Sequence, residues 1–130
     1  MGMKFLWDTN TAIYYLQSLF PANAEAYIDR LVSDNVPIIS VITEIELLCW
    51  KTSNNDDLKL LNEFIADVCV IELDQDTKRQ TAELRKRYRI KLPDAIIAAT
   101  ALVNGLTLIT RNVSDFKDIV GLTVINPWDL

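Results

Sequence analysis

The chain has 130 residues, 50% of them hydrophobic, and a formal net charge of −5 at pH 7. This length and composition predict a single domain, residues 1–130, with a buried core and no linker or repeat. Histidine is absent, which excludes imidazole acid–base chemistry, histidine-assisted nucleophiles and histidine metal ligands. No glycine-rich phosphate loop is present either, which excludes the nucleotide-binding motifs of that type.

Short apolar segments alternate with helical patterns along the chain. Alternation of this kind predicts an α/β fold in which a mainly parallel sheet of four or five short strands is covered on both faces. Strands are expected at residues 4–7, 36–39, 68–71, 106–110 and 122–125. Helices are expected from residue 11, at 22–33, from 40, from 58, at 74–88 and at 93–104, with a loop or single turn at 111–116 and an ordered tail at 126–128.

The two cysteines, Cys49 and Cys69, lie in apolar surroundings without a CxxC spacing. We therefore expect buried, reduced thiols of a cytoplasmic protein. The apolar run at residues 5–7 is too short for a secretory signal, and the uncharged run at 95–110 is too short for a bilayer span. No membrane partner is expected.

The helix that Ser40 is expected to cap contains two glutamates. A helical wheel gives a core stripe of Val41, Ile42, Ile45, Leu48 and Cys49, with Glu44 and Glu46 on opposite borders of it. Periodicity does not choose between these two acids.

The same wheel leaves Leu47 and Trp50 on the polar side of this helix. Two large apolar residues in such a position indicate a partner surface, and the alternative is incomplete burial in a small fold.

The segment from Leu92 to Asn112 carries a lone acid at the start of a buried unit. Pro93 suits the first turn of a helix and Asn104-Gly105 suits its end. No charged residue lies between Asp94 and Arg111. Asp94 therefore either complements the helix dipole or serves a site.

Three aspartates are expected at strand ends or at a helix start: Asp8, Asp94 and Asp115. A parallel sheet would gather them at one edge, where a glutamate of the Ser40 helix could join them. Each has a simpler explanation, because Asp8 could cap the following helix and Asp115 could belong to a turn.

Carboxylates that meet at one edge repel one another and raise one another's pKa unless a cation balances them. Ligand sets made only of oxygen favour Mg²⁺ or Mn²⁺, and such an ion can activate water for phosphodiester hydrolysis.

Basic residues cluster just before Asp94, with Glu83 as the only acid among them. The cluster is Lys78, Arg79, Arg85, Lys86, Arg87, Arg89 and Lys91. It is either a solvated helix face or a patch that follows the phosphates of a nucleic acid.

Four motifs in this order resemble the PIN-domain ribonucleases, above all the VapC toxins of prokaryotic toxin-antitoxin pairs. They are Asp8-Thr9-Asn10, the segment 40–47, the segment 92–101 and the segment 110–116, and the resemblance spans the whole chain. It implies a three-layer α/β/α fold and Mg²⁺- or Mn²⁺-dependent endoribonuclease activity. It also implies an RNA substrate, a cognate protein antitoxin that blocks the site, and a homodimer.

The resemblance also assigns roles to residues. It implies an acidic catalytic site of Asp8, Glu46, Asp94 and Asp115, in which the three aspartates hold the metal, with Thr9 and Asn112 beside it. It selects Glu46 because the glutamate of the family precedes a leucine. Where many relatives have a glycine shortly after that glutamate, this chain has Cys49-Trp50.

The basic cluster then becomes a candidate RNA-binding surface, with Arg85, Lys86, Arg87, Arg89 and Lys91 as its members nearest to Asp94. The alternative function is a non-catalytic module whose acidic pocket captures an arginine or lysine of a partner. A phospho-acceptor receiver domain fits less well, because the paired acid after its first strand and the lysine after its last strand are both missing.

Overall fold

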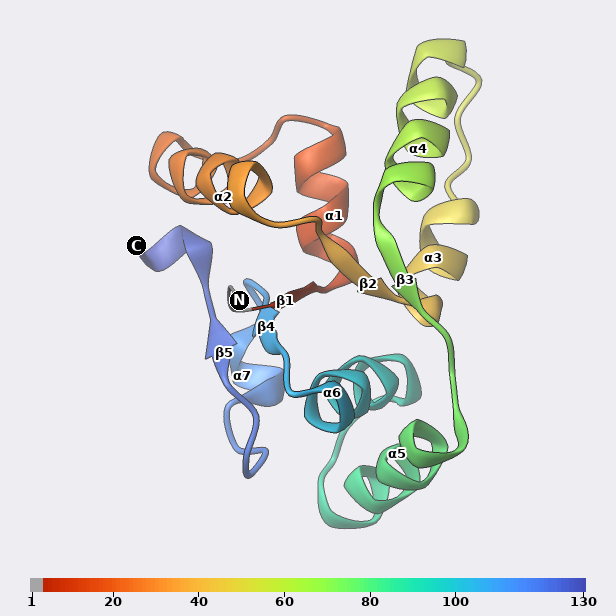
Figure 1. The fold of residues 1–130 in the computed structure, drawn as a ribbon, viewed down its shortest axis with the longest axis vertical. Helices are drawn as coiled ribbons and strands as arrows, with labels where there is room; N and C mark the ends of the chain where they lie inside the picture. The colour runs from red at the N-terminus through yellow and green to blue at the C-terminus, as the bar shows by residue number, and fades with distance from the viewer. Residues whose placement is uncertain (1–3) are drawn as a thin grey trace.

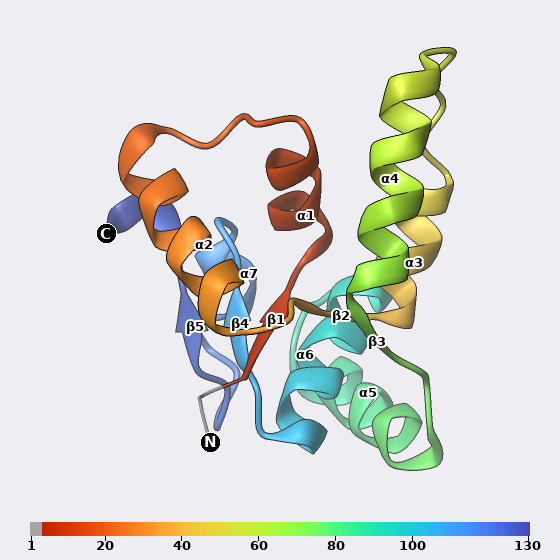
Figure 2. The ribbon, with the colours of Figure 1, turned by 45° about the horizontal axis from the view of Figure 1, so that its top comes forward.

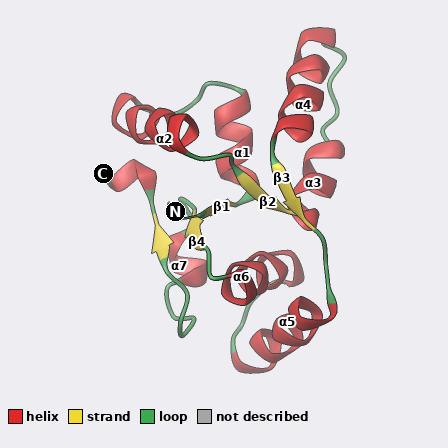
Figure 3. Ribbon diagram, viewed as in Figure 1, coloured by secondary structure: helices red, strands yellow, loops and turns green. Residues whose placement is uncertain are grey.

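The structure is a computed structural model that describes residues 4–130. Residues 1–3, which the single-domain prediction also included, lie outside the described part. Five parallel strands form one sheet in the order β3-β2-β1-β4-β5 (Figures 1 and 3). They are β1 (Phe5–Trp7), β2 (Ile38–Ser40), β3 (Cys69–Ile71), β4 (Thr107–Ile109) and β5 (Val124–Ile125). The prediction of an α/β fold with a parallel central sheet is confirmed.

Helices cover both faces of this sheet, as Figure 2 shows. On one side lie α1 (Thr9–Leu16), α2 (Ala22–Asp34) and α4 (Asn55–Asp67), and on the other α5 (Gln75–Arg87), α6 (Leu92–Asn104) and α7 (Val113–Phe116). The short α3 (Val41–Leu48) follows β2, and a 3₁₀ turn, η1 (Pro127–Asp129), packs against α2. The three-layer arrangement that the resemblance implies is therefore present.

Alternation along the strands creates two separate cores. Trp7 faces the α1, α2 and α4 layer, where its ring packs on those of Tyr15 and Phe64, and Leu6 faces the α5 and α6 layer with Leu108. Successive strand residues point to opposite faces, so a strand buried on both faces must be apolar throughout. This explains the unbroken apolar run of β1.

Local signals set the ends of several elements. Helix α6 has its proline in the first turn and ends at Gly105, whose φ of 64° lies in the left-handed region that glycine adopts without strain. Strand β2 begins at Ile38, directly after Pro37 and two residues later than the predicted start at residue 36, because proline has no N–H to donate to the ladder.

The helical wheel of α3 gave the wrong core stripe. Leu47 is buried, whereas Ile45 and Leu48 are 49% and 58% exposed. The other fully buried residue on this face of α3 is Thr43, one turn before Leu47, and its hydroxyl contacts that of Thr9 in α1. A wheel that weights only apolar residues misses this threonine and so rotates the stripe toward the wrong face.

The prediction of two buried cysteines is also wrong, because Cys49 and Cys69 are both exposed. Cys69 lies in β3, the edge strand of the sheet, and Cys49 follows the last turn of α3. Within residues 4–130, no helix combines the length and the apolar character needed to cross a membrane.

The register of the two central strands positions the candidate site. Trp7 of β1 pairs with Ile109 of β4, so the residues that follow them, Asp8 and Thr110, leave the sheet side by side at its carboxyl edge. Parallel sheets place ligands at this edge.

Candidate active site

Asp8 is a buried carboxylate held from two sides. It follows β1, is 6% exposed and caps α1 by accepting a hydrogen bond from the backbone N–H of Thr11 at 2.9 Å. Its other oxygen accepts a hydrogen bond from the hydroxyl of Thr110, which follows β4. Helix capping and membership of an acidic site are therefore not alternatives for Asp8, because it does the first and lies in the second.

Glu46 is brought to the same edge by a threonine pair. The hydroxyl of Thr9 donates to Oε1 of Glu46 at 2.5 Å and lies 3.1 Å from the hydroxyl of Thr43. Glu46 lines the acidic cavity and Glu44 does not. Of the two glutamates that helical periodicity could not separate, Glu46 is thus the one that lies with the aspartates at this edge.

Asp94 approaches from the opposite layer. It lies in the first turn of α6, is half-buried and lines the cavity. Asp115 lies on α7, where one of its oxygens accepts a hydrogen bond from the amide of Asn112 at 2.8 Å. Asp115 is exposed and does not line the cavity itself, but its charge acts on Asp94.

These elements enclose an acidic cavity of about 330 Å³ at the carboxyl edge of the sheet. Its polar wall combines carboxylate, amide and hydroxyl groups, and its apolar wall comes from α1, α6 and α7. The lining residues are Asp8, Thr9, Asn10, Ile13, Glu46, Asp94, Ile97, Asn112 and Phe116. Of the predicted set, all but Asp115 line the cavity.

Negative charge in this cavity is poorly compensated. Burial raises the pKa of Asp8, and the hydrogen bonds from Thr11 and Thr110 offset only part of this effect. Burial also raises the pKa of Asp94, and the charges of Asp115, Asp8 and Glu46 raise it further, while Lys91 opposes them. Among the described residues, no basic side chain forms an ion pair with these acids, so the protein itself does not balance their negative charge.

The donor set suits a hard divalent ion. Within the described residues, no three or more carboxylate or thiol side chains converge closely enough to ligate one ion by themselves. Mg²⁺ does not require such a cage, since it keeps several water ligands and often takes only one or two protein carboxylates. Asp8 and Asp94 are the two carboxylates in this cavity whose pKa values are raised.

None of the predicted RNA-binding residues lines the acidic cavity. Arg85, Lys86 and Arg87 form the last turn of α5, and Lys91 directly precedes α6. All are exposed, as is Arg89, and the one ion pair found in residues 4–130 joins Lys86 to Glu83 at 3.3 Å. Of these cations, Lys91 is the one whose charge acts on Asp94.

Two residues that position the site, Thr110 and Thr43, are not among those predicted from the sequence. Thr110 is expected at the end of a strand, the same kind of location that identifies Asp8, so its position is a usable signal. Thr43 gave none, because a threonine beside an apolar stripe reads as an ordinary helix residue.

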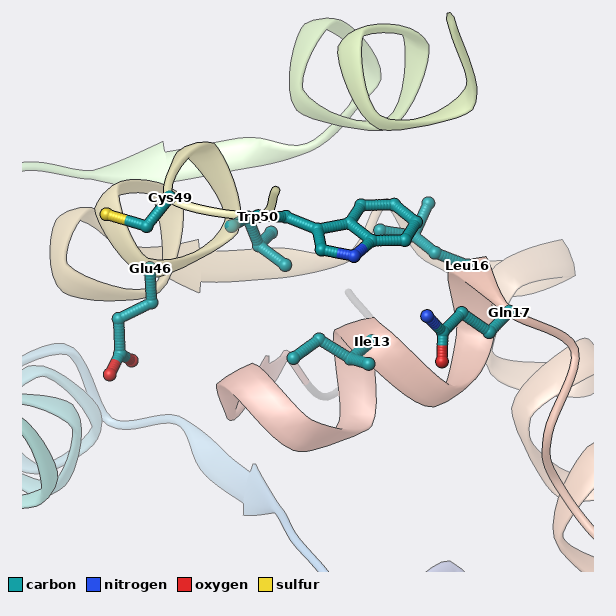
Figure 4. Close-up of a pocket in the computed structure, with 7 residues that line it drawn as sticks. Ile13, Leu16, Gln17, Glu46, Cys49 and Trp50 are labelled. Carbon is teal, nitrogen blue, oxygen red and sulfur yellow. The ribbon is translucent and has the colours of Figure 1, made fainter. Parts of the chain in front are cut away.

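A second, apolar cavity of about 200 Å³ adjoins the acidic one between α1 and α3 (Figure 4). Its lining is Ile13, Leu16, Gln17, Glu46, Leu47, Cys49 and Trp50. The indole of Trp50 extends over it toward Leu16, and the carboxylate of Glu46 points away from the indole. Ile13 and Glu46 line both cavities.

Comparison with known proteins gives the family of this chain. The PIN domain model matches residues 5–122, so the chain belongs to the PIN domain family. Within this family it is similar to VapC ribonucleases. Ribonuclease VapC2 of Rickettsia felis is 27% identical over 135 residues, which cover 98% of this chain and 99% of that protein.

Other similarities are shorter or structural. The plasmid stability protein StbB of Pseudomonas syringae pv. tomato is 40% identical over 65 residues, and this match spans 46% of either protein. The chain thus aligns with about half of that relative's length. A DNA-bound VapBC structure from Salmonella typhimurium gives a TM-score of 0.80 at 28% identity, covering 97% of this chain and 99% of that one. A toxin-antitoxin complex from Klebsiella pneumoniae gives a TM-score of 0.78 at 30% identity, covering 98% of this chain and 100% of that one.

Repulsion in the acidic cavity predicts a stabilising substitution. A carboxyl group whose pKa is raised by folding binds its proton more tightly in the folded state, so stability falls as the pH rises through that pKa. In metal-free protein at pH 7, Asp94→Asn should therefore raise the Tm by a few degrees, and the gain should shrink toward pH 4. Thermal unfolding in EDTA measures this, with the exposed Asp29→Asn as control. A lower Tm for Asp94→Asn at pH 7 would contradict the charge account.

Proposed function

We propose that the chain is a metal-dependent endoribonuclease of the cytoplasm that hydrolyses RNA phosphodiester bonds and acts as the toxin of a toxin-antitoxin pair. The observation that carries this proposal is the acidic cavity, which Asp8, Glu46 and Asp94 line with Asp115 nearby, and in which no basic side chain of residues 4–130 forms an ion pair with these acids. Membership of the PIN domain family and similarity to proteins named as VapC ribonucleases support it.

In the proposed mechanism, Asp8, Asp94 and Asp115 are the residues that would hold Mg²⁺ or Mn²⁺. A bound ion would supply Lewis acidity and an activated water. The hydrogen bonds from Thr11 and Thr110 fix the orientation of the Asp8 carboxylate before substrate arrives. Glu46, fixed by Thr9, is the candidate acceptor for a proton from the attacking water.

The remaining polar groups would orient these acids and the substrate. The side-chain amide of Asn112 donates to the carboxylate of Asp115, and the backbone N–H of Asn112 donates to the hydroxyl of Thr110. One residue therefore links two of the contacts that position the site. RNA must approach a negative cavity, which requires cations nearby. We propose that Arg85, Lys86, Arg87, Arg89 and Lys91 supply them on the α5 and α6 side.

The proposed activity has a direct test with a matched pair of glutamates. With Mn²⁺ and single-stranded RNA, the wild type should cut internal phosphodiester bonds, EDTA should stop the cutting, and Asp94→Asn should abolish it. Glu46→Gln should lower the rate by about tenfold or more, whereas Glu44→Gln, on the same helix but outside the cavity, should not. The measurement is the initial rate of cleavage of end-labelled RNA. Undiminished cleavage by Asp94→Asn would refute the assignment.

We also propose that a cognate protein antitoxin blocks the site through the apolar cavity. An apolar side chain of the antitoxin would enter the space beneath Trp50, and a neighbouring arginine or lysine would reach Glu46, which both cavities share. The solved complexes similar to this chain support a partner of this kind. If the purified protein binds such a partner but cuts no RNA, the non-catalytic binding module becomes the better proposal.

Filling the apolar cavity should separate inhibition from catalysis. Cys49→Phe adds a ring at an exposed lining position and should weaken inhibition by the proposed antitoxin about tenfold, the cost of one lost apolar contact. Cleavage without inhibitor should persist. Cys69→Phe, at the other exposed cysteine, is the control. Equal inhibition of both variants would show that the antitoxin does not use this cavity.

We further propose that the chain forms a homodimer through α3. The outward face of this helix exposes Ile45 and Leu48, a pair of large apolar side chains one turn apart. Light scattering after size exclusion should give twice the monomer mass for the wild type and the monomer mass for Ile45→Asp. Leu60→Asp, at an equally exposed position on α4 (49%), should remain dimeric. A monomeric wild type would rule the dimer out.

A further inference from the structure

A third cavity, of about 190 Å³, adjoins the acidic one on the side away from α5 and α6. Its lining is Asn10, Tyr14, Arg111, Asn112 and Trp128. Asn10 and Asn112 also line the acidic cavity, so the two cavities share a wall. The lining of this third cavity includes one guanidinium and no carboxylate, so its charge is opposite to that of the acidic cavity.

Arg111 is held in place by two aromatic residues. Its guanidinium carbon lies 5.3 Å from the ring centroid of Trp128, and its Nη1 donates to the hydroxyl of Tyr14 at 3.3 Å. The Trp128 ring in turn packs on Tyr14 and Phe20, with centroids 5.2 and 5.1 Å apart. A cation stacked on an aromatic face loses less freedom when it binds a ligand, because it is already oriented.

The support beneath Arg111 is itself anchored. The side-chain amide of Asn23, at the start of α2, donates to the carbonyl of Trp128 at 3.1 Å. The backbone N–H of Trp128 donates to the side-chain oxygen of Asn126 at 2.9 Å. The η1 turn is therefore tied to α2, and the indole is a fixed platform rather than part of a loose tail.

Most of the binding capacity of Arg111 is unused. A guanidinium has five N–H donors, and Tyr14 takes one of them. Within residues 4–130, no carboxylate lies within ion-pair distance of Arg111. A planar cation with free donors, stacked on an indole beside a candidate nuclease site, suits a phosphate with a neighbouring base.

We propose that Arg111, Tyr14 and Trp128, with Asn10 and Asn112, form a subsite for one nucleotide of single-stranded RNA, next to the phosphate that is cut. Arg111 binds the phosphate of that nucleotide, and the two asparagine amides face its sugar and base. This inference rests on the proposed ribonuclease function. It makes Arg111 a substrate-binding residue rather than a catalytic one.

The subsite also predicts the path of the RNA across the protein surface. Lys91 flanks the acidic cavity beside α6, and Arg111 flanks it beside α1, in the opposite layer of the fold. A strand that contacts both cations must cross the acidic cavity between them. The cations thus offset the repulsion that the carboxylates would otherwise exert on the backbone of the RNA.

Binding and cleavage by four variants test the subsite. The probe is a fluorescein-labelled single-stranded RNA of 12 random nucleotides, and binding is measured by anisotropy in an Asp94→Asn background to prevent cutting. Arg111→Ala should weaken binding about tenfold, as expected for one charged hydrogen-bonding contact. Its salt dependence should fall by about 0.7 in slope. Arg111→Lys should recover part of the affinity, and Tyr14→Phe should cause a smaller loss. Arg30→Ala, an exposed arginine of α2, is the control.

Cleavage with Mn²⁺ in the otherwise wild-type protein should show the effect of Arg111→Ala mainly as a higher KM. If this variant binds and cuts like the wild type, the subsite is wrong and the ribonuclease function stands. If the wild type neither binds nor cuts the RNA, both proposals fall. If kcat and Tm drop together and Arg111→Lys does not rescue binding, Arg111 only tethers η1. If antitoxin binding alone is lost, the cavity holds an acidic segment of the partner, and the nucleotide subsite is rejected.

Discussion

The carboxyl edge of the sheet is organised by one buried carboxylate, that of Asp8. Its two oxygens join the start of α1, through Thr11, to the end of β4, through Thr110. The hydroxyl of Thr11 completes the junction by donating to the carbonyl of Ile109 at 3.1 Å. A buried charge is costly unless it is hydrogen-bonded, so these contacts are what allow an ionisable group to remain at the centre of the fold.

Acidic side chains gather at this edge of the sheet while basic side chains lie apart from them, an arrangement that packing of the core does not require. The acids of α3, α6 and α7 approach Asp8 from both layers, and burial together with the charges of Asp115, Asp8 and Glu46 raises the pKa of Asp94. Cations lie on either flank, at the end of α5 and at Arg111, but they do not neutralise the cavity. Such an arrangement is destabilising for the fold alone, and groups of this kind are typical of functional sites.

Most of the architecture could be predicted from local patterns. The apolar run of β1, the proline and glycine that bound α6, and the alternation of strands with helices all act through short-range sterics and burial. The aspartates at strand ends were also predictable, because parallel strands deliver their carboxyl ends to one edge. Glu46 required the family resemblance, since two glutamates on one short helix have equivalent periodicity.

What could not be predicted depends on contacts between distant segments. The true inner face of α3 is set by a threonine that meets Thr9 across 34 positions of sequence. The exposure of Cys69 follows from the position of β3 at the edge of the sheet. Arg111 and Trp128 are 17 positions apart by number, and nothing in either residue's neighbourhood indicates that they stack.

The proposed mechanism requires a divalent ion in the acidic cavity, and anomalous diffraction from a crystal of the protein soaked in Mn²⁺ would detect one there. We expect an anomalous peak about 2.0–2.3 Å from carboxylate oxygens of Asp8 and Asp94, with the remaining ligands mainly water. Soaking the Asp94→Asn variant in the same way should weaken or remove the peak. No peak in the wild-type cavity at millimolar Mn²⁺, or a peak only elsewhere on the molecule, would contradict the account.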